Sequence, residues 1–316
     1  MAAGSGRAVV LVGLAALALG AGAGPAPAQP AAPGAAYSQP QKLCDIDDVR
    51  LSEVSGLAAS RRHPGLYYAH NDSGGEPCVY VLDRRGAVRV TLRLSGASNV
   101  DWEDIAVAPG AQPQSWDVCV ADIGDNQAAR REVVIYRFPE PELRDGPLEF
   151  LDVAARACRC TYEAGPSDAE GFAVHPQTGD GFIFTKRLDG ACDVYRLPAP
   201  WPGAGLARLR RVAALRLPED VLPIGRLVTA ADIAPDGKRL ATRSYLGGWE
   251  WRLSEAEQGD FLSIFRQKPV ALRLAAEPQG EALCYAADGR ALLTISEQRP
   301  TALYEVGLPE AGQHGP

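Results

Sequence analysis

One pattern occurs five times in this chain of 316 residues and limits the folds that it can adopt. In each copy a polar or acidic residue leads into a short apolar segment. That segment ends at a turn containing Gly, Pro, Asn or Asp, and a second apolar segment follows. The pattern is typical of β-hairpins, because these residues let the backbone turn tightly. The copies begin near residues 53, 101, 168, 229 and 279.

A third strand follows each hairpin, and a fourth, outer strand fits most of the copies. Five such units in a row predict an all-β chain folded as a β-propeller with five four-stranded blades. The middle repeats are longer than a usual blade of roughly 40–50 residues, so six blades, one of them degenerate, is an alternative. The last repeat has only three strands, and we expect Lys42–Leu51 to supply the fourth and close the ring.

The N-terminal residues have the features of an export signal. Arg7 precedes an apolar run from Ala8 to Ala23, and Ala26-Pro27-Ala28 offers the small residues of a signal-peptidase site. A membrane anchor is the alternative, but the run is short and poor in Leu. We therefore expect an exported protein, periplasmic or extracellular. The expected segments are a signal peptide at 1–28, a disordered Pro/Ala linker at 29–40, one propeller domain at 41–310 and a disordered tail at 311–316.

The net charge of −7 limits the partners. It argues against a nucleic-acid partner, because phosphate binding needs clustered Lys and Arg. The same charge argues against attachment to anionic lipid, and we expect no stable membrane insertion after signal cleavage. We expect a monomer that binds a small molecule, in one interpretation an anionic one.

Seven cysteines follow the signal segment. In an exported protein they favour disulfides with one thiol left over. Cys158 and Cys160 would lie on one face of a strand. The alternative is that several of the cysteines are small buried hydrophobic residues.

In a propeller the loop before each first strand and the loop after each second strand open on one face, at the mouth of the central channel. These loops carry many oxygen-bearing side chains. Carboxylates crowded together raise one another's pKa, and a hard cation relieves the repulsion. Ca²⁺ takes six to eight oxygen ligands at roughly 2.3–2.6 Å. We therefore predict a divalent-metal site, with Ca²⁺ as the cofactor. The candidate ligands are Asn71, Asp72, Asp101, Glu103, Asp122, Asp125, Asn126 and Glu170.

Two further sets of residues complete the candidate site. The candidate catalytic carboxylates are Glu103, Glu170 and Glu281, which stand at equivalent positions of three repeats. The candidate substrate-binding residues are His70, Lys186, Arg243 and Tyr245. A structural role is the alternative for each of them, because Asp and Asn cap turns and propellers use carboxylates to join blades.

The sequence lacks the motifs of several other enzyme classes. The chain has no GxSxG, P-loop or HExxH sequence, and its four histidines do not suit a His-rich zinc centre.

Three stretches carry a resemblance to known proteins: SGLAASRRHPGLYYAHNDSGG, EGFAVHPQTGDGFIFTK and GEALCYAADGRALLTISE. They resemble exported bacterial β-propellers of the phytase-like group with esterase-like activity. They are more distantly similar to gluconolactonase and regucalcin-like propellers. The resemblance spans about residues 44–307. It implies calcium or another divalent ion at the channel mouth and hydrolysis of a phosphoester or a lactone. Glu170-Gly171 matches the stretch that carries a metal-binding Glu in the lactonase-like group.

Three functions remain open from the sequence. The first is a metal-dependent hydrolase acting on a phosphoester or lactone. The second is a periplasmic or extracellular binding propeller with no catalytic activity. The third is a five-bladed glycosidase that uses Asp101, Glu170 and Glu281 as acid, base and orienting carboxylate.

Overall fold

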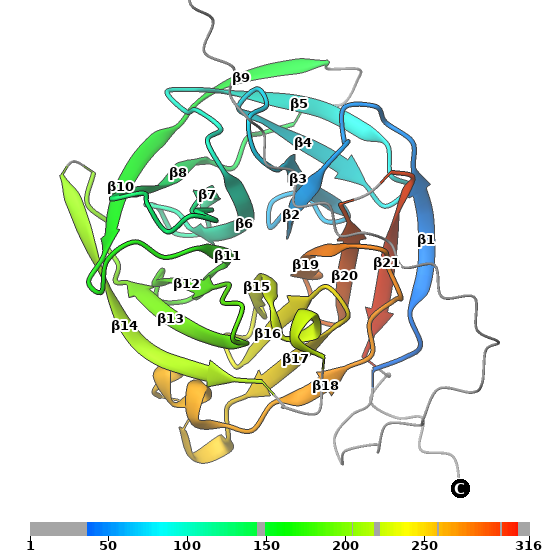
Figure 1. Ribbon diagram of the computed structural model, residues 1–316. Coiled ribbons are helices and arrows are strands. Elements are labelled where there is room, and N and C mark those ends of the chain that lie inside the picture. Colours follow the sequence, from blue (N-terminus) through cyan, green and yellow to red (C-terminus); the bar gives the residue numbers. More distant parts are fainter. Residues whose placement is uncertain are drawn as a thin grey trace, which may run out of the picture. The chain divides into compact units, whose positions relative to one another are not determined.

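The repeats fold as β-sheets throughout (Figure 1). The computed structural model describes residues 37–143, 149–203, 205–217, 222–257, 259–297 and 299–308. In these ranges the chain forms strands and three short 3-10 helices, which confirms the prediction of an all-β fold. The predicted signal peptide, most of the predicted linker and the predicted tail lie outside the described residues.

Each of the first three repeats supplies four strands of an antiparallel set. The first repeat forms β2 (Val54–Ala59), β3 (Leu66–Asn71), β4 (Cys78–Asp83) and β5 (Val88–Ser95). The second forms β6 (Trp102–Pro109), β7 (Trp116–Asp122), β8 (Val133–Pro139) and β10 (Arg156–Tyr162). The third forms β11 (Ala169–Val174), β12 (Gly181–Thr185), β13 (Ala191–Leu197) and β14 (Leu206–Arg216).

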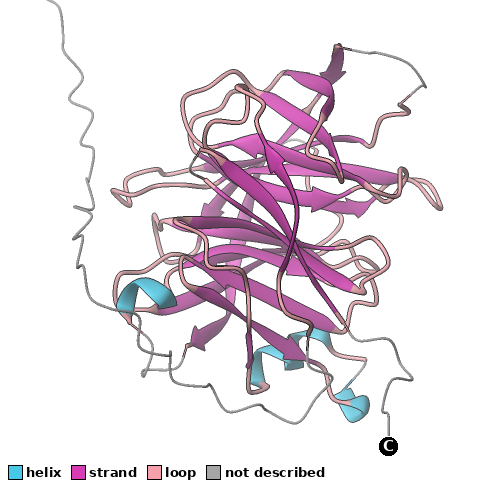
Figure 2. Cartoon of the chain, turned by 90° about the vertical axis from the view of Figure 1, so that its right-hand side faces the viewer, coloured by secondary structure: helices cyan, strands magenta, loops and turns pink. Residues whose placement is uncertain are grey.

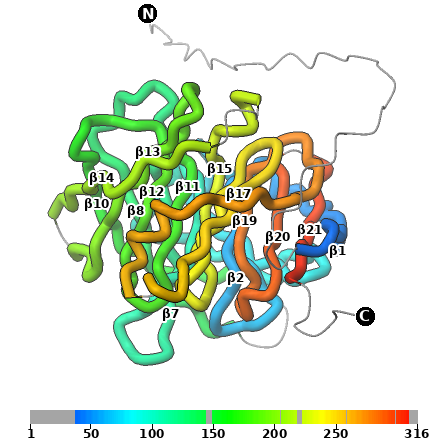
Figure 3. The backbone as a smooth tube through the Cα atoms, turned by 90° about the horizontal axis from the view of Figure 1, so that it is seen from below, coloured from blue at the N-terminus to red at the C-terminus, as the bar shows by residue number. Residues whose placement is uncertain are grey.

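The last two repeats follow the same plan. The fourth forms β15 (Val228–Ile233), β16 (Arg239–Ser244), β17 (Gly247–Arg252) and β18 (Val270–Leu272). The fifth forms β19 (Gly280–Tyr285), β20 (Ala291–Ser296) and β21 (Thr301–Gly307), and β1 (Gln41–Ile46) is its outer strand. The pairing of β1 with β21 is antiparallel, and the two strands lie side by side in Figure 3. This is the pairing that the sequence predicted for Lys42–Leu51.

Two parallel pairings link outer strands. β9 (Phe150–Ala154) pairs with β5, and β10 pairs with β14, so the second and third sets share one eight-stranded sheet. The strand β9 explains why the second repeat is long. Its residues follow β8 in the sequence but extend the sheet of the first repeat.

The first strands of the five repeats contact one another in a closed cycle, from β2 through β6, β11 and β15 to β19 and back to β2. Figure 1 shows them around the centre, with the later strands of each repeat outside them. Every residue of β2, β11 and β19 is buried. Strands covered on both faces are nearly continuous apolar runs rather than alternating ones. Between neighbouring sheets the core is apolar: Tyr68 and Val81 of the first repeat pack with Trp102 and Val120 of the second.

The helices are short and lie outside the sheets (Figure 2). η1 (Pro223–Arg226) precedes β15, whereas η2 (Glu255–Glu257) and η3 (Phe261–Arg266) lie between β17 and β18. Ile264 of η3 is buried in the core between the third and fourth sheets. None of the helices in the described ranges is long and apolar enough to cross a membrane.

The expectation of disulfides is not met, because all seven cysteines, which lie in described segments, are free. The sulfur atoms of Cys158 and Cys160 come within 3.9 Å of each other across one face of β10. Cys119, Cys192 and Cys284 are buried in β7, β13 and β19. They occupy the core as small apolar side chains, which was the alternative interpretation.

One buried carboxylate joins three of the first strands. Asp104 in β6 is fully buried. Its Oδ2 accepts hydrogen bonds from the backbone N–H of Phe172 in β11 at 2.8 Å and of Ala231 in β15 at 3.1 Å. Its Oδ1 accepts one from Ile105 at 2.9 Å. The carboxylate therefore satisfies backbone donors that no neighbouring strand reaches.

We predict that Asp104→Ala lowers the free energy of unfolding by about 3 kcal/mol or more, because it leaves three buried N–H groups without an acceptor. Urea unfolding followed by circular dichroism measures the change. The control is Asp288→Ala, since this exposed turn residue accepts one N–H, that of Arg290. We expect its effect to be under about 1 kcal/mol. Equal losses in the two variants would contradict the bridging role of Asp104.

Candidate functional site

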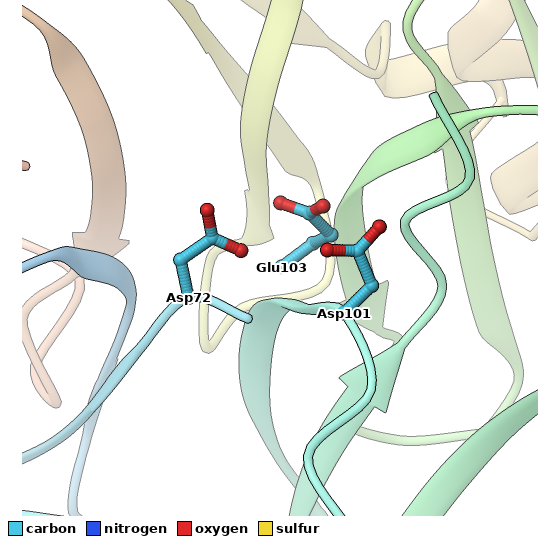
Figure 4. Close-up of side chains that lie close together, drawn as sticks. All are labelled: Asp72, Asp101 and Glu103. Carbon is cyan, nitrogen blue, oxygen red and sulfur yellow. The ribbon is translucent and has the colours of Figure 1, made fainter. Parts of the chain in front are cut away.

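Three carboxylates from two sheets meet where the first strands begin. Asp72 follows β3, Asp101 precedes β6, and Glu103 is the second residue of β6. One oxygen from each lies within 4.8 Å of the other two. Figure 4 shows the three side chains directed toward a common space. Glu103 is buried, whereas Asp72 and Asp101 are partly exposed. The arrangement could hold a metal ion, and we refer to it as the acidic triad.

A shared irregularity of the backbone positions Glu103. In every repeat the pairing of the first strand with the second shifts by one residue at its start. Such a bulge leaves one residue out of the ladder and re-aims its side chain. The five residues at these shifts are all buried: Ser55, Glu103, Glu170, Thr229 and Glu281. The three predicted catalytic carboxylates are thus structurally equivalent.

The other two positions show what the bulge does without a carboxylate. The hydroxyl of Ser55 donates to the backbone oxygen of Glu103 at 2.7 Å, and that of Thr229 donates to the backbone oxygen of Gly280 at 2.9 Å. Each therefore bonds to the first strand of the next repeat. Ser55 holds the backbone of the triad residue Glu103 in this way.

A glycine gives the triad its space. A Cβ atom on Gly124 would lie 2.1 Å from Oε1 of Glu103 and 2.5 Å from Oδ2 of Asp101. No side chain fits there unless both carboxylates move. Gly124 belongs to the loop after β7, and its N–H donates to the Asp101 carbonyl at 3.2 Å.

Lys186 supplies a positive charge beside the triad. Its ammonium forms an ion pair with Oε1 of Glu170 and donates to the Tyr245 hydroxyl at 3.4 Å. The same charge lowers the pKa values of Asp72 and Glu103, but burial and the neighbouring carboxylates outweigh it. Glu170 retains one buried oxygen, Oε2, without a hydrogen-bond partner.

Burial and mutual repulsion raise the pKa values of these acids. Burial, followed by the charge of Glu297, raises the pKa of Asp72 to about 6. Burial, followed by the charge of Asp72, raises the pKa of Asp101 to about 6. The pKa of Glu103 lies well above its usual value because of burial and then Asp72 and Asp101. Burial and Glu297 raise that of Glu281 to about 8. The site is short of positive charge.

Most of the other predicted metal ligands have bonding partners within the fold. Asp122 pairs with Arg130 at 2.7 Å and accepts the N–H groups of residues 100 and 101 at 3.2 Å. Asp125 accepts the N–H groups of residues 129 and 130 at 3.0 and 2.7 Å. Asn71 donates to the Arg50 carbonyl at 2.6 Å, and Asn126 is exposed. None of the acids Asp122, Asp125 and Glu170 belongs to the triad, and their roles as ligands stay predictions.

The predicted substrate-binding residues divide into two groups. Lys186 and Tyr245 lie among the carboxylates whose pKa values are raised, and Tyr245 is hydrogen-bonded to Glu281. Arg243 is buried, pairs with Glu277 at 2.7 Å and donates to the Ala282 carbonyl at 3.2 Å.

His70 is buried, with its ring edge-on to Trp102 at 5.6 Å between centroids. Burial lowers its pKa to about 4, so its imidazole is neutral at pH 7. For His70 and Arg243 substrate binding stays a prediction.

Sequence reasoning missed two residues that shape the site. Arg130 donates to the carbonyl of Gly124 at 2.7 Å as well as pairing with Asp122. Gly124 lies between the predicted ligands Asp122 and Asp125 in the sequence. The feature that could have pointed to both residues is the long polar loop after the second strand of the second repeat, β7.

The chain matches no protein-family model, and no curated protein matches its sequence.

The raised pKa values predict how metal-free protein responds to pH. A carboxyl whose folded pKa exceeds its unfolded value stabilises the fold at low pH, and that contribution is lost as pH rises through the folded value. In EDTA we expect the free energy of unfolding to fall by about 1 to 2 kcal/mol between pH 5 and 7.5, after allowance for solvent screening. The double variant Asp72→Asn/Asp101→Asn should show a smaller fall. A steeper fall in the variant would contradict this account.

Proposed function

We propose that the fold is a five-bladed β-propeller whose channel mouth binds a divalent cation. The closed cycle of five first strands, each followed outward by the later strands of its repeat, supports five blades rather than six. The pairing of β1 with β21 supports closure of the ring by the N-terminal strand. The loops that carry the triad define the mouth.

The acidic triad carries the proposal of a metal site. Three carboxylate oxygens within 4.8 Å repel one another unless a cation or protons neutralise them. Oδ1 of Asp72 is buried without a hydrogen-bond partner, so this carboxylate has unused ligand capacity. A purely structural carboxylate would have its oxygens satisfied by donors, as those of Asp104 are.

Calcium suits this donor set best. The triad offers only oxygen atoms, which hard cations prefer, and three carboxylates leave coordination positions for water and substrate. Zinc favours sites with His or Cys ligands. Neither residue type joins the cluster among the described residues.

The reaction class that the mouth suits is metal-dependent hydrolysis of an anionic phosphoester or a lactone. A bound divalent cation polarises the substrate or activates water. The ammonium of Lys186 attracts an anionic group of the substrate. Oε2 of Glu170 has no hydrogen-bond partner, which supports a role for Glu170 as general base. Glu281 holds its proton up to a pH of about 8 and is a candidate acid.

The resemblance to phytase-like and lactonase-like propellers supports the same reaction class. The N-terminal sequence supports export to the periplasm or the extracellular space. We propose that the protein acts there as a monomer on a small molecule.

A binding propeller without catalytic activity is the second candidate, and a specific observation favours it. Asp122, Asp125 and Arg243 are engaged in bonds that hold loops and neighbouring sheets. The acidic triad could then hold an ion that only stabilises the fold, with no reaction taking place at the site.

We predict that Ca²⁺ added to EDTA-treated protein at pH 7.5 raises the melting temperature by several degrees. A ligand that binds only the folded state stabilises it by about 2.7 kcal/mol when its concentration is a hundred times Kd. Glu103→Gln should abolish the shift by removing a ligand charge. Gly124→Ala, which keeps all three carboxylates but fills their space, should reduce it. Asp288→Asn is the matched control and should respond as wild type. An unchanged melting temperature in wild type, or an equal shift in Glu103→Gln, would refute the metal site.

We predict turnover of phosphoesters or lactones in a screen that also contains aryl glycosides. EDTA should abolish it, and Glu170→Gln should lower kcat by about a hundredfold, as expected for loss of a general base. Asp288→Asn again serves as control. Turnover of glycosides alone would favour the glycosidase. A calcium-dependent melting shift with no turnover of any substrate would favour the binding propeller.

A further inference from the structure

A second charged site lies on the outer strands of the third repeat, on strands that carry no residue of the acidic triad. A cavity of about 410 Å³ is lined by Arg196, Pro198, Arg208, Arg210 and Val212. These residues come from the end of β13 and the first part of β14, which are outer strands in Figure 1. The triad belongs to the first and second repeats, so the two sites share no residue and no strand.

The strand register gathers the three arginines on one face. Arg196 and Arg210 are directly opposed in the antiparallel pair β13–β14. Arg208 stands two residues before Arg210 and therefore points to the same face, because side chains alternate along a strand. Like charges directly opposite each other destabilise a sheet. An anion between them would remove this repulsion.

One of the three charges of the cavity is paired within the described residues, and two are not. Asp180 pairs with Arg196 at 2.7 Å. Within the part of the chain that the structure describes, Arg208 and Arg210 take part in no ion pair or side-chain hydrogen bond, and both are exposed. On the opposite face, Arg211 pairs with Asp193 at 3.3 Å. The cavity therefore carries two uncompensated positive charges in a protein whose net charge is −7.

The walls of the cavity are mainly apolar, being formed by Pro198, Val212 and the aliphatic stems of the arginines. A bare anion would leave this surface unused, and the volume falls within the range of small-molecule sites. Guanidinium groups bind phosphate oxygens through paired hydrogen bonds. A ligand with a dianionic head and a compact apolar body matches both the two free charges and the walls.

We propose that this cavity binds a small organic phosphate, with Arg208 and Arg210 holding the phosphate group and Pro198 and Val212 contacting the organic part. Arg196 of the neighbouring strand β13, which is oriented by its ion pair with Asp180, lies beside the phosphate group. The site requires neither the metal nor the reaction proposed for the mouth.

The test is a calorimetric titration of the full chain with phenylphosphonate at pH 8 in EDTA. This probe has a dianionic head and an apolar ring, and it cannot be hydrolysed as an ester. EDTA removes any metal from the mouth, so the result does not depend on the proposed metal site. We expect one saturable site per chain. We expect Arg208→Gln/Arg210→Gln to weaken binding by about tenfold or more, through loss of charge-assisted hydrogen bonds.

Arg211→Gln is the matched control, because it removes one charge from the same strand on the other face, and it should bind as wild type. The double variant should melt no lower than wild type, since it relieves like-charge repulsion. Inorganic phosphate should bind more weakly than phenylphosphonate because it leaves the apolar walls bare. The proposal is overturned if wild type shows no saturable binding, if Arg211→Gln weakens binding as much as the double variant, or if inorganic phosphate binds equally well.

Discussion

The carboxylate of Asp104 is the interaction on which the arrangement of the first strands depends. These strands lie side by side in a cycle, yet each forms its ladder with the second strand of its own repeat, so donors on the inner side lack a β partner. Asp104 accepts such donors from β11 and β15 while belonging to β6. Asp232 does the same for Tyr285 in β19 at 2.7 Å. Carboxylates thus form hydrogen bonds between the first strands of different repeats.

The bulge at the start of each first strand separates this structural use of carboxylates from the candidate functional one. Glu103 occupies the bulged position, and Asp104 follows it in the ladder. The bulge re-aims the side chain of Glu103, so its carboxylate lies with Asp72 and Asp101, whereas the carboxylate of Asp104 bonds the neighbouring first strands. Two neighbouring residues of one sequence motif therefore have different partners. The acidic stretch around Trp102 serves stability and the candidate metal site at once.

The sequence predicted the positions of the five first strands to within one residue, because acidic starts, apolar runs and glycine turns recur together. It also predicted the equivalence of Glu103, Glu170 and Glu281. It did not predict β9, whose partner β5 lies more than 50 residues earlier in the chain and whose pairing depends on tertiary contacts. Asp104 and Asp232 both bond other first strands, but the register places Asp232 two residues further along its strand than Asp104. A pattern of residue types cannot show which carboxylate oxygens already accept hydrogen bonds. Those of Asp122 do, whereas Oδ1 of Asp72 does not.

The pairing of β1 with β21 has a consequence for how the chain reaches this fold. Gln41 is opposite Glu305. Contacts between such distant residues form late, because the loop-closure entropy is large. During synthesis β1 emerges before the other described strands, and its partner β21 emerges after them. Until then the fifth sheet has no completed edge, and the cycle of first strands has a gap between β15 and β2. In a partly made chain β1 therefore has no partner, and an unpaired strand is a site at which aggregation can begin.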